Sequence, residues 1–132
     1  MNITSPESLL RVFCLSLACW REARGESLLG QLLVAQTIEN RVRDPRWPET
    51  YVGVITQRLQ FSAFNRDDPN VTAYPREDDP AWADCVAAAR FVLAAPSPLT
   101  AANHYHVTSV SPAWADRDKI VAREHRHIFY RL

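Results

Sequence analysis

The chain has 132 residues, of which 47% are hydrophobic, and this length and composition predict a single domain, residues 1–132, with a compact core. Fifteen basic residues balance fifteen acidic ones, which argues against a dedicated nucleic-acid-binding protein with its usual basic face. The three cysteines, Cys14, Cys19 and Cys85, are odd in number and irregular in spacing. We therefore expect no disulfide framework and favour synthesis in the reducing cytoplasm.

No apolar run reaches the 18 residues of a typical transmembrane helix, so no stable membrane insertion is expected. The short apolar stretch from Val12 to Trp20 follows no basic segment, and it continues into Arg21 and Glu22 instead of a small-residue cleavage site. We therefore predict a core helix and no signal peptide. If the protein acts outside the membrane, another component must let it out.

The first half of the chain shows helical spacing. Ser5 and Pro6 predict the N-cap and first turn of a helix that ends near Glu22, with Gly25 as the stop. A second helix is predicted from near 26–27 to about Arg43. Its apolar residues cover most of its circumference, which is typical of a helix in the middle of a domain.

Prolines at 45 and 48 break the chain, after which we expect a third helix at 49–59 and an extended or turn-like segment at 60–64. A loop is predicted up to Pro80, followed by an alanine-rich helix at 80–95. Aromatic and β-branched residues at 104–107 and 127–130 predict short strands. Helices first and strands last predict an α+β domain, mainly helical, with a small C-terminal β-hairpin or sheet.

Glu22 is the main catalytic candidate from the residues alone. It continues the core-facing stripe of Cys14 and Ala18, and it falls in the last turn of its helix, where the dipole presents partial negative charge. Burial and this field both raise the pKa of a carboxyl group, and an acid that keeps its proton near neutral pH can protonate the oxygen of a breaking glycosidic bond. On spacing alone, an exposed Glu22 paired with Arg21 or Arg24 is the favoured alternative.

Glu26 lies at the N-terminus of the second helix, where the dipole and free N–H groups stabilise a carboxylate and lower its pKa. An ionised, helix-capping role therefore suits Glu26 better than the role of a proton donor. A helper role, such as holding a water molecule or Arg24, stays open.

Short motifs spread in order along nearly the whole chain carry a family resemblance. They are Glu22-Ala23-Arg24-Gly25-Glu26 with Gly30-Gln31, Val34-Ala35 and Asn40-Arg41-Val42, then Gln60-Phe61-Ser62, His104-Tyr105-His106 with Ser111-Pro112-Ala113-Trp114, and His127-Ile128-Phe129-Tyr130. Together they resemble the SleB-type cell-wall hydrolases, the spore-cortex-lytic family. The chain departs from the family pattern at 100–103, where a glycine-containing approach is usual, and at His125, where glycine is frequent.

The resemblance implies a lysozyme-like fold related to lytic transglycosylases, in which the catalytic glutamate closes a helix at the cleft and corresponds to Glu22. It implies cleavage of peptidoglycan glycan strands between N-acetylmuramic acid and N-acetylglucosamine, through a one-carboxylate transglycosylase reaction. A phage or prophage endolysin, made in the cytoplasm, released through a holin-type pore and acting on the cell wall, fits the compact form. The substrate-binding candidates are Gln60, Ser62, Tyr105, His104, Glu26 and Asn40.

Each of these candidates also has a structural alternative. Gln60 and Ser62 can belong to a turn whose Phe61 packs in the core, and Tyr105 can be a core residue, as aromatic residues in strands often are. Asn40 can have a purely structural role on the second helix. The pairs His104/His106 and His125/His127 each project to one face of a strand and could build a zinc site. That pattern is short and common, so we expect neither metal nor cofactor. The alternatives to a lytic transglycosylase are a muramidase, a non-catalytic wall-binding or virion module and, less favoured, a zinc-dependent hydrolase.

Overall fold

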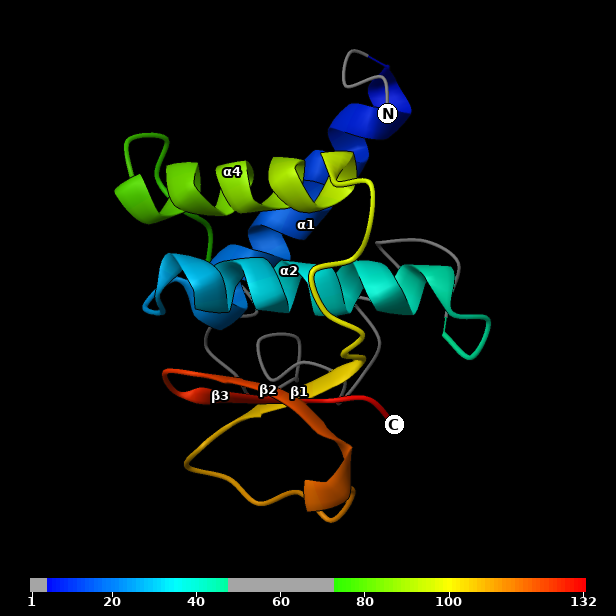
Figure 1. The fold of residues 1–132 in the computed structure, drawn as a ribbon. Helices are drawn as coiled ribbons and strands as arrows, with labels where there is room; N and C mark the ends of the chain where they lie inside the picture. The colour runs from blue at the N-terminus through cyan, green and yellow to red at the C-terminus, as the bar shows by residue number, and fades with distance from the viewer. Residues whose placement is uncertain (1–4, 48–72) are drawn as a thin grey trace.

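A computed structural model describes residues 5–47 and 73–132 (Figure 1). Its described elements are α1 (Pro6–Ala23), α2 (Leu28–Arg43), α4 (Pro80–Ala94), β1 (His104–Val107), the 3-10 helix η3 (Arg117–Lys119), β2 (Ile120–Glu124) and β3 (His127–Tyr130). The predicted helix at 49–59 and the segment at 60–64, with Gln60 and Ser62, lie outside the described residues. The predicted α+β class, mainly helical with a small C-terminal sheet, is confirmed.

Capping side chains fix where the helices begin. The hydroxyl of Ser5 accepts a hydrogen bond from the backbone N–H of Ser8 at 3.2 Å, and Pro6 opens α1 as predicted. Ser27 caps α2 in the same way, accepting from the N–H of Gly30 at 3.1 Å. Each helix therefore starts where the sequence offers a side-chain acceptor for otherwise unsatisfied N–H groups.

The middle helix of the domain is α2, which contacts α1, α4 and β1 (Figure 1). The predicted central position is therefore confirmed, although its first turn leaves Leu28 and Leu29 59% and 50% exposed. The core joins all three helices to the sheet, and its fully buried side chains include Leu15, Ala18, Val34, Ile38, Ala89 and Phe129.

The sheet is antiparallel with the strand order β1-β3-β2. Both predicted strands are confirmed, whereas β2 was not predicted from the sequence. In the register, Tyr105 of β1 pairs with Phe129 of β3, and Val107 pairs with His127. The turn between β2 and β3 contains His125, which has a positive φ of 50°. This turn brings residues 125–127 back to the helices, where the candidate site lies.

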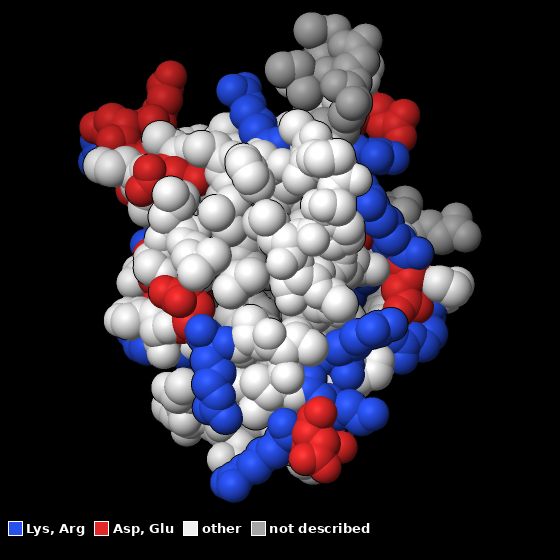
Figure 2. Space-filling view, viewed as in Figure 1, with Lys and Arg blue, Asp and Glu red and all other residues white. Residues whose placement is uncertain are grey.

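The three cysteines are buried and free. In the described ranges, no helix is both long and apolar enough to cross a membrane. On the face seen in Figure 2, acidic and basic side chains lie around a largely uncharged centre, in keeping with the zero formal net charge.

Candidate active site

A pocket of about 600 Å³ lies where α1 ends. Three segments line it: residues 21–26 at the end of α1 and in the loop to α2, residues 107–109 at the end of β1 and just after it, and residues 126–127, where the β2–β3 turn leads into β3. The loop is short because the N–H of Glu26 bonds back to the carbonyl of Ala23 at 2.9 Å and Ser27 at once caps α2. These local contacts place both Glu22 and Glu26 beside one cavity.

Gly25 follows the end of α1 as predicted, but it does not adopt the left-handed conformation common at helix ends. Its small size has another use. A Cβ atom at this position would lie 3.0 Å from Nη2 of Arg126, so a side chain would press on the guanidinium that crosses the loop. Glycine therefore allows the β2–β3 turn to approach the loop closely.

Glu22 is partly buried and lines the pocket. It interacts with Tyr105 of β1, since burial, the charge of Glu22 and a hydrogen bond with Glu22 raise the pKa of the Tyr105 phenol well above its ordinary value. It also interacts with Arg41 of α2, whose pKa burial lowers to about 10 against the opposing charges of Tyr105 and Glu22. Three elements thus bring a carboxylate, a phenol and a guanidinium together.

Arg21 and Arg24, the neighbours considered as ion-pair partners of Glu22, both lie along the pocket wall. The Nε of Arg21 donates to the carbonyl of Ala73 at 2.9 Å. The guanidinium of Arg24 lies over the Trp20 ring, 4.3 Å from its centroid. Both cations therefore have packing partners of their own on α1 or beside it.

The second glutamate, Glu26, has a side chain that is only 2% exposed. It contacts His125, Nε of Arg126 at 3.3 Å and Nδ1 of His127 at 2.8 Å. Burial raises the pKa of Glu26, but the hydrogen bond from His125 and the nearby charges of His127 and Arg126 outweigh it and lower the pKa overall. The predicted lowering is confirmed, although these side chains, rather than the helix terminus, dominate it.

In His127, unlike in Glu26, burial decides the direction of the pKa shift. Burial lowers the pKa of its imidazole, and this effect outweighs the opposing charge of Glu26. The ring also packs edge-on against Tyr105, with centroids 5.3 Å apart. His127 therefore lies between Glu26 and the Tyr105 side of the site.

His104 and His106 share a different environment, beside the ring of Trp114 at 5.0 Å and 5.7 Å. Nδ1 of His104 bonds to the side-chain oxygen of Asn103 at 2.8 Å, and burial together with the charges of Arg41 and Arg46 lowers its pKa to about 4. His106 bonds through Nε2 to the Tyr130 hydroxyl at 2.7 Å. The pair shares one face, as the strand period predicts, and neither lines the pocket of Glu22.

Within the described ranges, no group of three or more His, Cys, Asp or Glu side chains could hold a metal ion. The two histidine pairs also have separate partners. His104 and His106 contact Trp114, whereas His125 and His127 contact Glu26.

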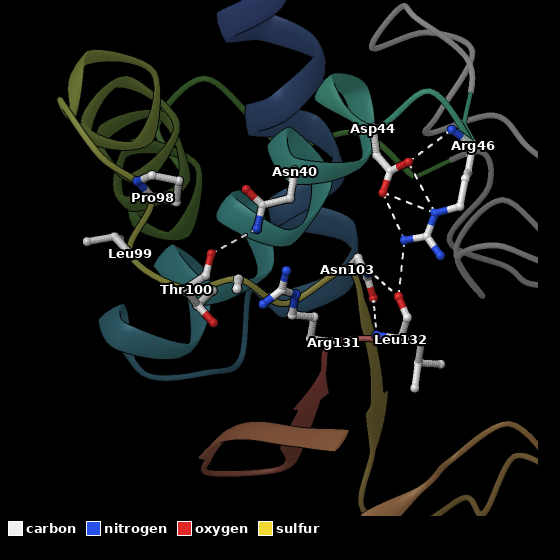
Figure 3. Close-up of a pocket in the computed structure, with 10 residues that line it drawn as sticks. Asn40, Asp44, Arg46, Pro98, Leu99, Thr100, Asn103, Arg131 and Leu132 are labelled. Atoms are coloured by element: carbon white, nitrogen blue, oxygen red, sulfur yellow. Dashed lines mark hydrogen bonds and ion pairs between the residues drawn. The ribbon is translucent and has the colours of Figure 1, made fainter. Parts of the chain in front are cut away.

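Asn40 lies at another cavity, of about 700 Å³, shown in Figure 3. Its Nδ2 donates to the carbonyls of Thr100 and Ala102 at 2.9 and 2.8 Å, and its Oδ1 accepts from Gln36 at 2.9 Å. Asn40 therefore fixes the position of residues 100–102, which lead into β1. This cavity is larger than the one beside Glu22, but among the described residues of its lining the one acidic side chain, Asp44, is paired with Arg46 at 2.8 Å.

Of the residues singled out from the sequence, Glu22, Glu26 and Tyr105 gather at one site, while His104 and Asn40 lie away from it. Sequence reasoning missed Arg41 and Arg126. Arg41 belongs to the Asn40-Arg41-Val42 motif, which carries part of the family resemblance. Arg126 lies between the histidines of a His-x-His pair and carried no signal of its own.

Comparison with solved structures shows a shared fold. The catalytic domain of the germination-specific lytic transglycosylase SleB from Bacillus anthracis superposes with a TM-score of 0.73 and 25% identity, over 98% of each chain. The catalytic domain of the Bacillus cereus SleB protein gives 0.70 and 26% identity, over 98% of this chain and 96% of that one. These similarities confirm the predicted lysozyme-like fold.

Sequence comparison gives shorter matches to curated relatives. The spore cortex-lytic enzyme of Halalkalibacterium halodurans is 46% identical over 46 residues, which are 35% of this chain and 14% of the relative. That of Bacillus subtilis is 43% identical over 49 residues, 37% of this chain and 16% of the relative. The matched segments therefore span less than a fifth of these relatives.

The family model described as Cell Wall Hydrolase matches residues 25–130, most of the chain. Its matched range includes Glu26, Tyr105, Arg126 and His127, and it begins three positions after Glu22. The chain is thus an enzyme of the SleB type and belongs to the cell wall hydrolase family.

Proposed function

We propose that the protein cleaves peptidoglycan glycan strands between N-acetylmuramic acid and N-acetylglucosamine, as a lytic transglycosylase with Glu22 as acid and base. The observation that carries this proposal is the position of Glu22, in the wall of a cavity of about 600 Å³ and beside Tyr105 and Arg41. The family match and the likeness to a SleB catalytic domain described as a lytic transglycosylase support it.

Glu22 suits the acid role better than Glu26. These are the two carboxylates that line the pocket in the described part of the chain. Glu26 is held by three basic side chains and has a lowered pKa, so it is a poor proton donor near neutral pH. Glu22 is partly buried and lines the same pocket, so we assign the acid role to its carboxyl group.

The reaction needs one carboxylate in two roles. Protonated Glu22 gives its proton to the bridging oxygen as the bond from C1 of N-acetylmuramic acid to that oxygen breaks, which releases the 4-hydroxyl of N-acetylglucosamine. The Glu22 carboxylate then takes the proton of the 6-hydroxyl of the same muramic residue, whose oxygen attacks C1. A 1,6-anhydro ring forms, no water is consumed, and Glu22 is protonated again.

Tyr105 and Arg41 act on Glu22 in this scheme. The hydrogen bond with Tyr105 orients the carboxyl group, so Tyr105 is a positioning residue. The charge of Arg41 stabilises the carboxylate that exists between the two proton transfers. The Tyr105 hydroxyl and the Arg41 side chain are both buried, which shields their interactions with Glu22 from solvent.

The remaining site candidates have proposed roles of two kinds. Gln60 and Ser62 are proposed contacts to acetamido or hydroxyl groups of the sugars. His104 and Asn40 act indirectly, because His104 packs on Trp114 and Asn40 holds the chain before β1. Synthesis in the cytoplasm, the endolysin role and release through a holin-type pore stay predictions.

Mass spectrometry of the products tests the reaction type. Purified glycan strands treated with the protein should end in 1,6-anhydro-muramic acid, and reducing ends in their place would identify a muramidase. A zymogram on purified walls without a clear band would favour a non-catalytic wall-binding or virion module. Loss of activity with a chelator, restored by zinc, would favour the zinc-dependent hydrolase.

A further inference from the structure

We infer that the pocket of Glu22 recognises a carboxylate group of its substrate through Arg126 and Arg24. The substrate class is a glycan strand whose peptide side chains carry free carboxylates near the cleaved bond, as opposed to a strand without such charges. This inference rests on the proposed function and narrows its substrate class.

The turn between β2 and β3 is fixed against the α1–α2 loop. Its three consecutive residues, His125, Arg126 and His127, all contact the buried carboxylate of Glu26. The backbone is tied as well, because the N–H of Thr108 donates to the carbonyl of Arg126 at 2.8 Å. A turn held at this many points presents its side chains in a defined place.

The backbone conformation of His125 is a second unusual feature of this turn. It adopts a φ of 50°, a conformation that is uncommon for any residue other than glycine and costs backbone energy. A histidine here loses the freedom of glycine, but its imidazole reaches Glu26. The contact to Glu26 therefore accompanies the strain, and it orients the residue that follows, Arg126.

Arg126 lies across the loop at the pocket edge. Its Nε is 3.3 Å from Glu26 and its Nη2 is 3.5 Å from the carbonyl of Gly25. These contacts use two of the five N–H donors of a guanidinium, and the side chain keeps an exposed fraction of 62%. Arg126 is thus anchored at one end of its guanidinium while its other donors remain accessible to a ligand in the pocket.

The charge balance of the pocket differs from that of the whole chain. Arg21, Arg24 and Arg126 line it together with Glu22 and Glu26, whereas the chain as a whole has a formal net charge of zero. Among the described residues of its lining, three arginines outnumber the one remaining carboxylate, Glu26, when Glu22 carries a proton. Formal positive charge is therefore in excess in this part of the pocket wall.

A carboxylate fits these donors. The planar fork of an arginine can donate two parallel hydrogen bonds to one carboxylate, which gives both affinity and orientation. The exposed hydroxyls of Thr108 and Ser109 lie in the same wall and can donate to further oxygens. Peptide side chains with free carboxylates are the part of a wall strand that offers such groups.

Binding measured without turnover tests this inference. Every protein in the test carries Glu22→Gln, so the strands stay intact, and the probes are two fluorescently labelled soluble peptide-bearing strands. One has free carboxylates, and the other has the same carboxylates converted to amides with carbodiimide and ammonia. The free-carboxylate strand should bind about tenfold more tightly, and this preference should shrink at high salt.

Added arginine substitutions locate the preference. Arg126→Gln or Arg24→Gln should reduce the ratio of the two dissociation constants to about twofold, and Arg126→Lys should keep part of it. Arg90→Gln, at an exposed arginine on α4, is the matched control and should keep the full ratio. Thermal unfolding of each variant identifies any loss of fold, and Arg24→Gln tests a second arginine of the lining independently of Arg126.

Equal dissociation constants for the two strands would overturn the inference, and so would a ratio that survives both arginine substitutions. Failure of the proposed function gives a different pattern. In that case the wild-type protein would release no product from either strand, while the binding ratio and its dependence on Arg126 would persist.

Discussion

Nδ1 of His127 lies 2.8 Å from Oε1 of Glu26, and both side chains are only 2% exposed. The two residues are about a hundred positions apart in the chain, so this contact joins the β2–β3 turn to the loop that ends α1. Together with its contacts to His125 and Arg126, it indicates that Glu26 fixes the position of the turn. Glu22, which lines the same pocket, is the carboxyl group to which we assign the proposed catalytic role.

Glu26→Gln should lower the free energy of unfolding by about 1–3 kcal/mol, because three basic side chains lose the charge they face. The folded pKa of Glu26 lies below its ordinary value of 4.5, so its stabilising effect is complete above that pH and is lost as the pH falls further. Urea unfolding at pH 7 and pH 3.5 measures both effects. The exposed Glu77→Gln is the control, and equal stability of the two variants at pH 7 would contradict the role of Glu26.

Two substitutions at His125 should separate the effect of its backbone conformation on stability from the effect of its side chain. Both His125→Gly and His125→Ala lose the contact to Glu26, but only glycine accepts a φ of 50° without strain. The alanine variant should therefore be less stable than the glycine variant by about 1 kcal/mol. Chemical denaturation resolves this difference, and an alanine variant as stable as the glycine variant would argue against a strained turn.

His104 should make the domain less stable in mild acid. Its folded pKa is about 4, against an ordinary value of 6.5, so the unfolded chain binds the proton more readily between these values. Stability is therefore complete above pH 6.5 and falls as the pH drops toward 4, by about 2 kcal/mol for a partly exposed ring. In His104→Asn, the pH dependence of urea unfolding over this window should shrink by that amount. A wild-type-like slope in the variant would place the effect on another group.

Tyr105→Phe should lower kcat by about tenfold with little change in KM, because Glu22 loses the hydrogen bond that orients it. That bond also favours the charged form of Glu22, so its loss should move the limb of the pH–rate profile that reports Glu22 to higher pH. Tyr74→Phe, at a tyrosine that is 66% exposed, is the matched control. A purely structural Tyr105 would change stability and leave the pH profile in place.

Local signals made the helices predictable. Ser5 and Pro6 mark the start of α1, and Asp79 and Pro80 mark the start of α4, because a side-chain acceptor and a proline act on neighbouring backbone groups. The strand at 127–130 was predictable for a similar reason, since its aromatic and β-branched residues are enriched in sheets. These elements depend on neighbours in the sequence.

The remaining features depend on distant contacts. The strand β2, with Arg123 and Glu124 in a short segment, shows weak alternation and forms by pairing with β3. The grouping of Glu26 with residues 125–127 likewise follows from the register of the sheet, which no local pattern encodes. His125 was visible in the sequence as a departure from the family pattern, but the turn and the partner of its imidazole could be found only in the fold.

The turnover of Glu22→Gln on purified glycan strands tests the central claim most directly, with release of 1,6-anhydro-muramic ends as the readout and Glu77→Gln as the control. The account predicts a loss of at least about a thousandfold in kcat, because the amide can neither give nor take the proton, with a thermal unfolding midpoint close to that of wild type. A Gln variant that keeps its fold and releases product at a rate near that of the wild type would contradict the assignment of Glu22 as the acid and base.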